Sequence, residues 1–219
     1  MGRTEPTAES PGQARLSRDL LIDTAIRLTD QEGSEAATLR RLGAELGVDA
    51  TAVYRYFRDK DELIAACADR LLTDAFESFH ASGDWREDIR GLALAVRRAY
   101  LSHPRMALMV LTATSPMTNE ARWSEAAMAL VRGVGLPERE AVLVFEVVEA
   151  YTVATSCMDA MGPPSGEPWR RTYSALPPDA FPNLTAMAPR LYQDADARFT
   201  FGLDLILDAL ERMAVGSEG

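Results

Sequence analysis

The chain has 219 residues, of which 47% are hydrophobic, and a formal net charge of −10 at pH 7. This length allows one large domain or a small domain joined to a larger one. The negative charge argues against nucleic-acid binding over the whole surface, because phosphates attract positive side chains. The most apolar stretch, 141–158, carries Glu146 and Glu149, which argues against a transmembrane helix. With no secretory pattern at the N-terminus, we expect a cytoplasmic protein in which Cys67 and Cys157 are free thiols.

Positive charge is concentrated in one short stretch that holds Arg40, Arg41, Arg55, Arg58 and Lys60. Lys60 is the only lysine of the chain. Arginine used almost without lysine is also what a GC-rich genome would produce. A local basic face on an acidic protein is nevertheless compatible with DNA binding.

The first segment, residues 1–16, is rich in Gly, Pro, Ser and Glu and is predicted to be a disordered arm. Apolar spacings of three and four dominate the rest, which predicts an all-α fold. A first helix should begin after Ser17, an N-cap residue, and end at Gly33.

Two short helices are predicted next. Thr38 caps the first, which ends at Gly47, and Asp49 caps the second. Asp59 followed by Glu62 resembles a capping box, so a longer fourth helix should run through about residue 82.

Further helices are predicted over residues 85–102, 105–113, 119–134, 137–161 and 194–215. Residues 162–185 contain six of the 12 prolines and cannot form one long helix. This segment either folds over a pocket of its own or a partner subunit, or is a disordered excursion.

Segment 38–60 satisfies the physical requirements of a helix-turn-helix, with two short helices meeting at a glycine turn and small residues at their contact. The second helix would expose Thr51, Arg55 and Tyr56. Such side chains reach base edges and phosphates in the major groove.

This segment resembles the DNA-binding domain of the TetR family, most clearly in Gly47-Val48, in residues 53–57 (VYRYF) and in Lys60. Residues 199–211 resemble the last helix of the tetracycline-repressor branch. The resemblance implies phosphate contacts from Thr38, Tyr54, Tyr56 and Lys60. It also implies base or groove contacts from Arg40, Thr51, Ala52 and Arg55. Arg41 belongs to the same candidate interface, although for Arg41 and Arg58 an ordinary surface role remains open.

Two segments, 141–158 and the last helix, are apolar on nearly every side and therefore need two surfaces to pack against. The resemblance implies a four-helix bundle made by these helices from two chains. One larger monomeric core is the alternative. The expected dimer interface comprises Phe145, Val148, Phe199, Leu203, Ile206 and Leu210.

The middle helices are rich in Met, Thr and aromatic residues, which suit an apolar ligand pocket but are also typical of plain core. The expected lining is Phe76, Tyr100, His103, Met109, Leu111, Thr114, Met117, Trp123, Tyr151, Thr155 and Met158.

Tetracycline-sensing relatives place metal-binding histidines where this chain has Phe76 and Leu111, and neither side chain can ligate a metal. We therefore expect no metal and no cofactor, and a largely apolar effector. The chain has two histidines and shows no nucleophile–base cluster and no phosphate-binding glycine loop, which predicts that it is not an enzyme.

The expected organisation is a helix-turn-helix domain at 17–63 and a larger helical ligand-binding and dimerisation domain at 64–215. The expected function is that of a homodimeric regulator, usually a repressor, which binds a palindromic double-stranded DNA operator and responds to an unidentified small molecule. The alternative is a helical ligand-binding or protein-interaction module without sequence-specific DNA binding.

Overall fold

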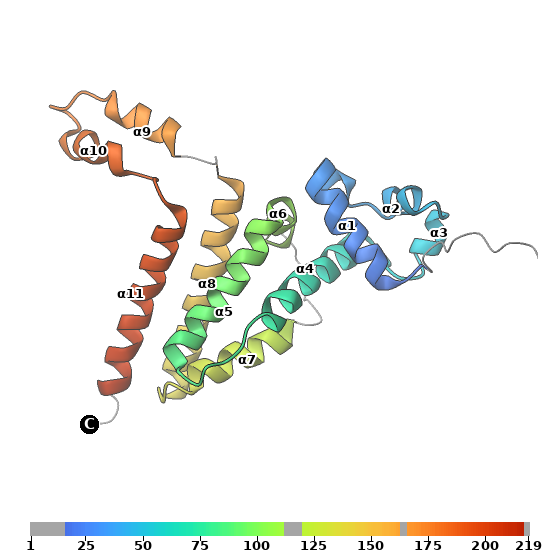
Figure 1. The fold of residues 1–219 in the computed structure, drawn as a ribbon, viewed down its shortest axis with the longest axis horizontal. Coiled ribbons are helices and arrows are strands. Elements are labelled where there is room, and N and C mark those ends of the chain that lie inside the picture. Colours follow the sequence, from blue (N-terminus) through green and yellow to red (C-terminus); the bar gives the residue numbers. More distant parts are fainter. Residues whose placement is uncertain (1–15, 112–119, 163–165, 217–219) are drawn as a thin grey trace, which may run out of the picture.

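Helices make up all regular structure in the residues that the computed structural model describes, which are 16–111, 120–162 and 166–216. They form a small group, α1 to α3, joined by α4 to a larger bundle (Figure 1). The predicted all-α fold is thus confirmed. The helices are α1 (Arg18–Glu32), α2 (Leu39–Leu46), α3 (Ala50–Val53), α4 (Lys60–Glu77), α5 (Trp85–Ser102), α6 (Pro104–Leu111), α7 (Glu120–Arg132), α8 (Glu138–Met161), α9 (Glu167–Ser174), α10 (Pro182–Met187) and α11 (Ala195–Gly216), with 3₁₀ turns at Ser34–Ala36 and Ala188–Arg190.

The predicted N-caps are confirmed by their hydrogen bonds. Ser17 Oγ accepts from the Leu20 amide at 3.1 Å, and Thr38 Oγ1 accepts from the Arg41 amide at 3.1 Å. Asp59 Oδ1 accepts from the Glu62 amide at 2.8 Å. The Glu62 carboxylate turns back to the amide of Arg58, one residue before the cap, so the capping box is displaced by one position.

Helix α4 ends at Glu77, several residues before the predicted end. The Asp88 carboxylate of α5 accepts hydrogen bonds from the amides of Ser82 and Gly83. These bonds hold the connection between α4 and α5 as a loop. These bonds favour the charged carboxylate and lower the pKa of Asp88.

One apolar cluster runs from the three N-terminal helices into α4 and α6, with Leu42, Phe57 and Leu63 fully or almost fully buried. A second cluster joins α5, α7, α8 and α11. Both cysteines are free and buried, as predicted, and burial raises the pKa of the Cys67 thiol to about 12.

Polar contacts join α1 to the larger bundle at both of its ends. Arg70 of α4 pairs with Asp19 and Asp23 of α1, each at 2.5 Å. Near the other end of α1, His103 Nδ1 lies 2.5 Å from Asp30, whose backbone carbonyl accepts from Arg105 at 2.9 Å. Residues of α4 and the start of α6 are therefore tied directly to α1.

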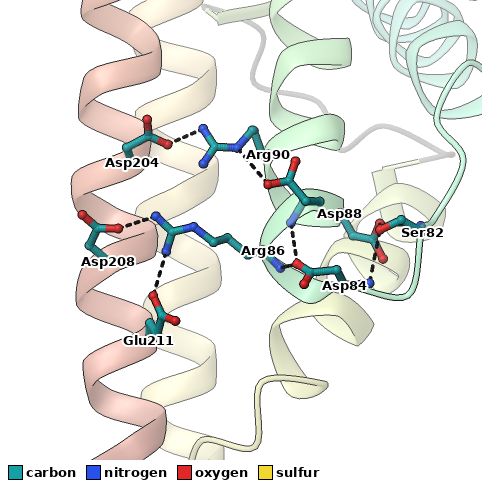
Figure 2. A network of polar contacts seen from close by, with 9 residues as sticks. Ser82, Asp84, Arg86, Asp88, Arg90, Asp204, Asp208 and Glu211 are labelled. Carbon is teal, nitrogen blue, oxygen red and sulfur yellow. Dashed lines mark hydrogen bonds and ion pairs between the residues drawn. The ribbon is translucent and has the colours of Figure 1, made fainter.

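Helix α11 is held against α5 by a ladder of ion pairs (Figure 2). Arg90 pairs with Asp204, and Arg86 pairs with both Asp208 and Glu211 of α11. On its apolar inner side α11 buries Phe199, Leu203, Leu207 and Leu210. These contacts leave a third, apolar side of α11 exposed.

The proline-rich segment contains two short helices, α9 and α10, which lie together beyond the ends of α8 and α11 (Figure 1). Arg170 secures them by donating to the backbone carbonyls of Leu191 and Tyr192. The prediction that no long helix forms here is confirmed. A wholly disordered excursion is excluded for residues 166–194.

Helix α8 is long and apolar enough to cross a membrane by length and composition alone, with a mean hydropathy of 1.5 over its best window. Its neighbours explain this composition differently. It packs against α5, α6, α7 and α11, and only 28% of that window is buried within one chain. Part of the apolar surface of α8 is therefore exposed in the single chain.

We predict that Arg97→Ala lowers the free energy of unfolding by about 3 kcal/mol, because its guanidinium is 3% exposed and bridges Asp159 and Asp196. Urea denaturation measures this loss. Arg98→Ala is the matched control, since Arg98 is the exposed neighbour. Equal effects from the two variants would show that the buried network contributes nothing specific.

Candidate DNA interface and ligand cavity

The turn between α2 and α3 depends on two glycines. Gly47 has a φ of 66°, which places it in the left-handed region that favours glycine, and ends α2. Gly43 lies so close to α3 that a Cβ there would meet the Val48 carbonyl oxygen at 3.0 Å. The two helices can therefore approach closely enough to hold α3 at a fixed angle.

Side chains of α3 and the turn after it divide into an inner and an outer set. Val53 and Phe57 are buried in the core, four residues apart. Thr51 and Arg55 are exposed, and Tyr54 has 55% of its surface exposed. This places an alcohol, a phenol and a guanidinium on one outward surface that no described residue covers.

Thr51 is oriented by the cap of its own helix. Its amide and hydroxyl both donate to Asp49 Oδ1, at 2.8 and 2.6 Å, and these bonds lower the pKa of Asp49. The arrangement fixes the rotamer of Thr51, so its methyl group and hydroxyl oxygen face outward in a defined position. A preset side chain of this kind suits base recognition.

Five of the expected DNA contacts have different surroundings. Arg40 is exposed, while Thr38 and Ala52 are half-buried, and Lys60 is half-buried at the first position of α4. Tyr56 is half-buried, and its hydroxyl donates to the Leu16 carbonyl at 2.8 Å. Tyr56 thus holds the start of the first helix in place, a role that the sequence did not reveal.

Arg41 differs most from its expected role. Its guanidinium pairs with Glu32 at 2.6 Å and with Glu45 at 2.9 Å, so it links α2 to the end of α1. Both carboxylates raise the pKa of Arg41. Because its charge is already matched by two carboxylates, we assign Arg41 to the scaffold of the domain and leave Arg40 as the outward-facing member of the pair.

A small apolar cavity of about 40 Å³ lies between α5, α7 and α8. Aliphatic and aromatic side chains form most of its wall, and Glu149 and Thr152 of α8 add the only polar groups in the described lining. The lining comprises Ile89, Leu92, Ala93, Val96, Ala127, Leu130, Val131, Phe145, Val148, Glu149, Thr152 and Val153.

None of the expected pocket residues whose side chains the structure describes lines this cavity, so the expected pocket stays a prediction. Tyr100 and Met109 are buried in the core and His103 pairs with Asp30. Tyr151 stacks on Phe199, and Met158 is 65% exposed. Phe76 is half-buried on α4, and the hydroxyl of Thr155 donates to the Tyr151 carbonyl. Thr114 and Met117 lie outside the described residues, as do the side chains of Leu111 and Trp123.

The sequence could not single out the lining of this cavity because most of its members are ordinary aliphatic residues at helical spacing. The described Met and aromatic residues that the sequence suggested as pocket lining instead fill the core or lie at the surface. Within the described part of the chain, no group of three or more His, Cys, Asp or Glu side chains could hold a metal ion.

The expected dimer residues lie in different surroundings, and their role in a dimer stays a prediction. Phe199, Leu203 and Leu210 are 0–2% exposed because they fill the chain's own core, and Phe145 and Val148 line the cavity. Ile206 alone among the six is half-buried and faces a surface groove without also filling the core or the cavity. That groove, of about 350 Å³, runs between α8 and α11 and is lined by Glu140, Leu143, Val144, Val147, Leu205, Ile206, Ala209, Leu210 and Met213.

Comparison with known proteins agrees with this architecture. Residues 21–67 match the family model of bacterial regulatory proteins of the tetR family, and residues 80–214 match that of the tetracyclin repressor-like C-terminal domain. The class of protein is therefore a helix-turn-helix transcriptional regulator with a helical regulatory domain. The chain belongs to the TetR family.

Individual relatives cover nearly the whole chain. The Escherichia coli tetracycline repressor protein class C is 28% identical over 206 residues, which cover 91% of this chain and 92% of that protein. The repressor DrrR1 of Streptomyces coeruleorubidus is 25% identical over 219 residues, 93% of this chain and 80% of that protein. ActR of Streptomyces coelicolor, solved with (S)-DNPA, matches with a TM-score of 0.79 and 27% identity, covering 92% of this chain and all of that one. These relatives are regulators, and the chain is accordingly a ligand-responsive DNA-binding regulator rather than an enzyme.

Neighbouring arginines of α2 provide a test of the interface. Arg40→Ala should reduce the slope of log affinity for duplex DNA against log salt by about one, because one phosphate-neutralising cation is lost. Arg41→Ala should leave that slope unchanged, since its charge is matched by Glu32 and Glu45. Fluorescence anisotropy across a salt series measures both. A lower slope for Arg41→Ala alone would reverse the two assignments.

Proposed function

We propose that the protein is a cytoplasmic homodimer that represses transcription by binding a roughly palindromic operator, and that a small, largely apolar molecule releases it. The exposed set of Thr51, Tyr54 and Arg55 on a rigid helix-turn-helix carries this proposal. Tyr54 and Lys60 would hold phosphates, whereas Thr51, Ala52 and Arg55 would read the bases.

The groove between α8 and α11 supports dimerisation. Leu143, Val147 and Leu205 are about half exposed there, and Phe201 and Met213 extend the exposed apolar surface along α11. Such a contiguous patch is uncommon on a monomer. Pairing it with the same patch of a second copy gives a two-fold four-helix bundle, which would present two recognition helices about 34–36 Å apart, one turn of DNA.

Ligand response would pass through α4 and α6. The cavity between α5, α7 and α8 lies next to α4, since α4 packs against α5 and α7. Helix α6 contacts α1 through Arg105, and His103, which lies between α5 and α6, pairs with Asp30 of α1. A molecule that enlarges the cavity would displace these helices and change the separation of the two recognition helices, with a typical coupling of about 1–3 kcal/mol. ActR has been solved with actinorhodin as well as with (S)-DNPA, which supports a small-molecule effector.

Selection of duplexes from a random DNA pool tests the proposal. The wild type should enrich a palindrome whose half-sites lie about one helical turn apart. A Leu143→Glu, Leu205→Glu variant should sediment as a monomer and enrich no palindrome, because four charges would face one another in the groove of the pair.

Leu101→Glu is the matched control, since Leu101 is an exposed leucine on α5 that does not line the groove. It should remain dimeric and select the same sequence as the wild type. A folded, dimeric wild type that enriches no motif would contradict the proposal and favour the protein-interaction module.

A further inference from the structure

Two hydroxyl groups of α8 are buried in the interior and have no hydrogen-bond partner among the described residues. Thr152 is 4% exposed and Ser156, one turn later, is fully buried, and neither side-chain oxygen has a partner among the described residues. Thr155 shows the usual alternative, because its hydroxyl donates to the Tyr151 carbonyl of the same helix. The two hydroxyl groups without a partner, those of Thr152 and Ser156, therefore lie on one buried face of α8.

An unpartnered buried hydroxyl carries the full cost of its desolvation. Thr152 also lines the cavity between α5, α7 and α8, whose wall includes Leu92, Val96 and Phe145. A molecule that fills the cavity and hydrogen-bonds Thr152 would remove that cost. The position of the hydroxyl thus marks where the polar group of a ligand belongs.

Glu149 lies three residues before Thr152 on the same face of α8 and lines the same cavity. A carboxylate offers about four acceptor positions, so it can accept a ligand's hydrogen bond in addition to any contact it already makes. The Thr152 hydroxyl can donate a hydrogen bond, and a carboxylate oxygen of Glu149 can accept one. One ligand hydroxyl can satisfy both, because it accepts from Thr152 and donates to Glu149.

At about 40 Å³ the cavity has room for a few water molecules and is far below the roughly 300 Å³ of typical ligand sites. A ligand must therefore separate α7 from α5 and α8. Helix α7 contributes Ala127, Leu130 and Val131 to the wall and contacts α4 as well. Entry of the ligand would consequently move the helix that leads to the DNA-binding domain.

We propose that the effector is an uncharged, mainly apolar molecule whose hydroxyl group binds between Thr152 and Glu149. This inference rests on the proposed ligand response of the same cavity. A ligand carboxylate is disfavoured, because it would be desolvated among apolar side chains next to Glu149.

The test uses 2-naphthol, naphthalene and 2-naphthoate as probes of one shape, titrated into the full-length wild type by calorimetry at pH 7. We expect 2-naphthol to bind about tenfold more tightly than naphthalene, and 2-naphthoate to bind more weakly than 2-naphthol. Thr152→Val should abolish the preference for 2-naphthol over naphthalene. Its melting temperature should equal or exceed that of the wild type, because the lost hydroxyl had no partner.

Thr155→Val is the matched control and should keep the preference, since that hydroxyl is already satisfied within the helix. Equal binding of 2-naphthol and naphthalene by the wild type, no binding of either, or a preference that survives in Thr152→Val would overturn the inference. The DNA selection described above is an independent readout. If the wild type enriches no DNA motif but still prefers 2-naphthol to naphthalene, the proposed function is contradicted and the inference about the cavity is not.

Discussion

Helix α8 must bury apolar side chains in two directions, and most of the structure follows from this requirement. Its inner side packs on α5, α6 and α7 and encloses the small cavity. Its outer side, with Leu143 and Val147 about half exposed, joins α11 in a groove that no described part of the chain covers. A single helix therefore contributes to the cavity proposed to bind the effector and to the surface proposed to join two copies. A change on one side of α8 cannot leave the other side unaffected, because a close-packed helix moves as a unit.

Helix α5 connects the same two regions by a different type of contact. Its apolar side lines the cavity through Ile89, Leu92 and Val96. Its arginines bind the carboxylates of α11, which carries the other half of the groove (Figure 2). These partly exposed ion pairs contribute little stability individually, but their directional geometry fixes the register of α11. The ion pairs thus connect the helix that lines the cavity, α5, to the helix that carries half of the groove, α11.

The sequence predicted the helix-turn-helix well because its signals are local. Caps at Ser17, Thr38 and Asp59, and a left-handed glycine at Gly47, act within a few residues and leave clear patterns. The cavity and the exposed interface could not be predicted in the same way. Whether Leu203 or Leu205 faces outward depends on which helices surround α11, and a helix apolar all round carries no periodic signal for that choice. The ion pairs of Arg41 likewise join residues that only the tertiary fold brings together.

The central claim is that the cavity and the DNA-binding domain are coupled. The most direct test is a substitution that overfills the cavity in the absence of a ligand. Ala127→Phe adds a ring to the α7 wall that about 40 Å³ cannot hold, whereas Ala129→Phe places the same ring on the exposed side of α7. Affinity for the selected operator would be measured for both variants after sedimentation and circular dichroism confirm folded dimers. The account predicts at least fivefold weaker binding for Ala127→Phe and unchanged binding for Ala129→Phe. Wild-type affinity in a folded, dimeric Ala127→Phe protein would contradict it.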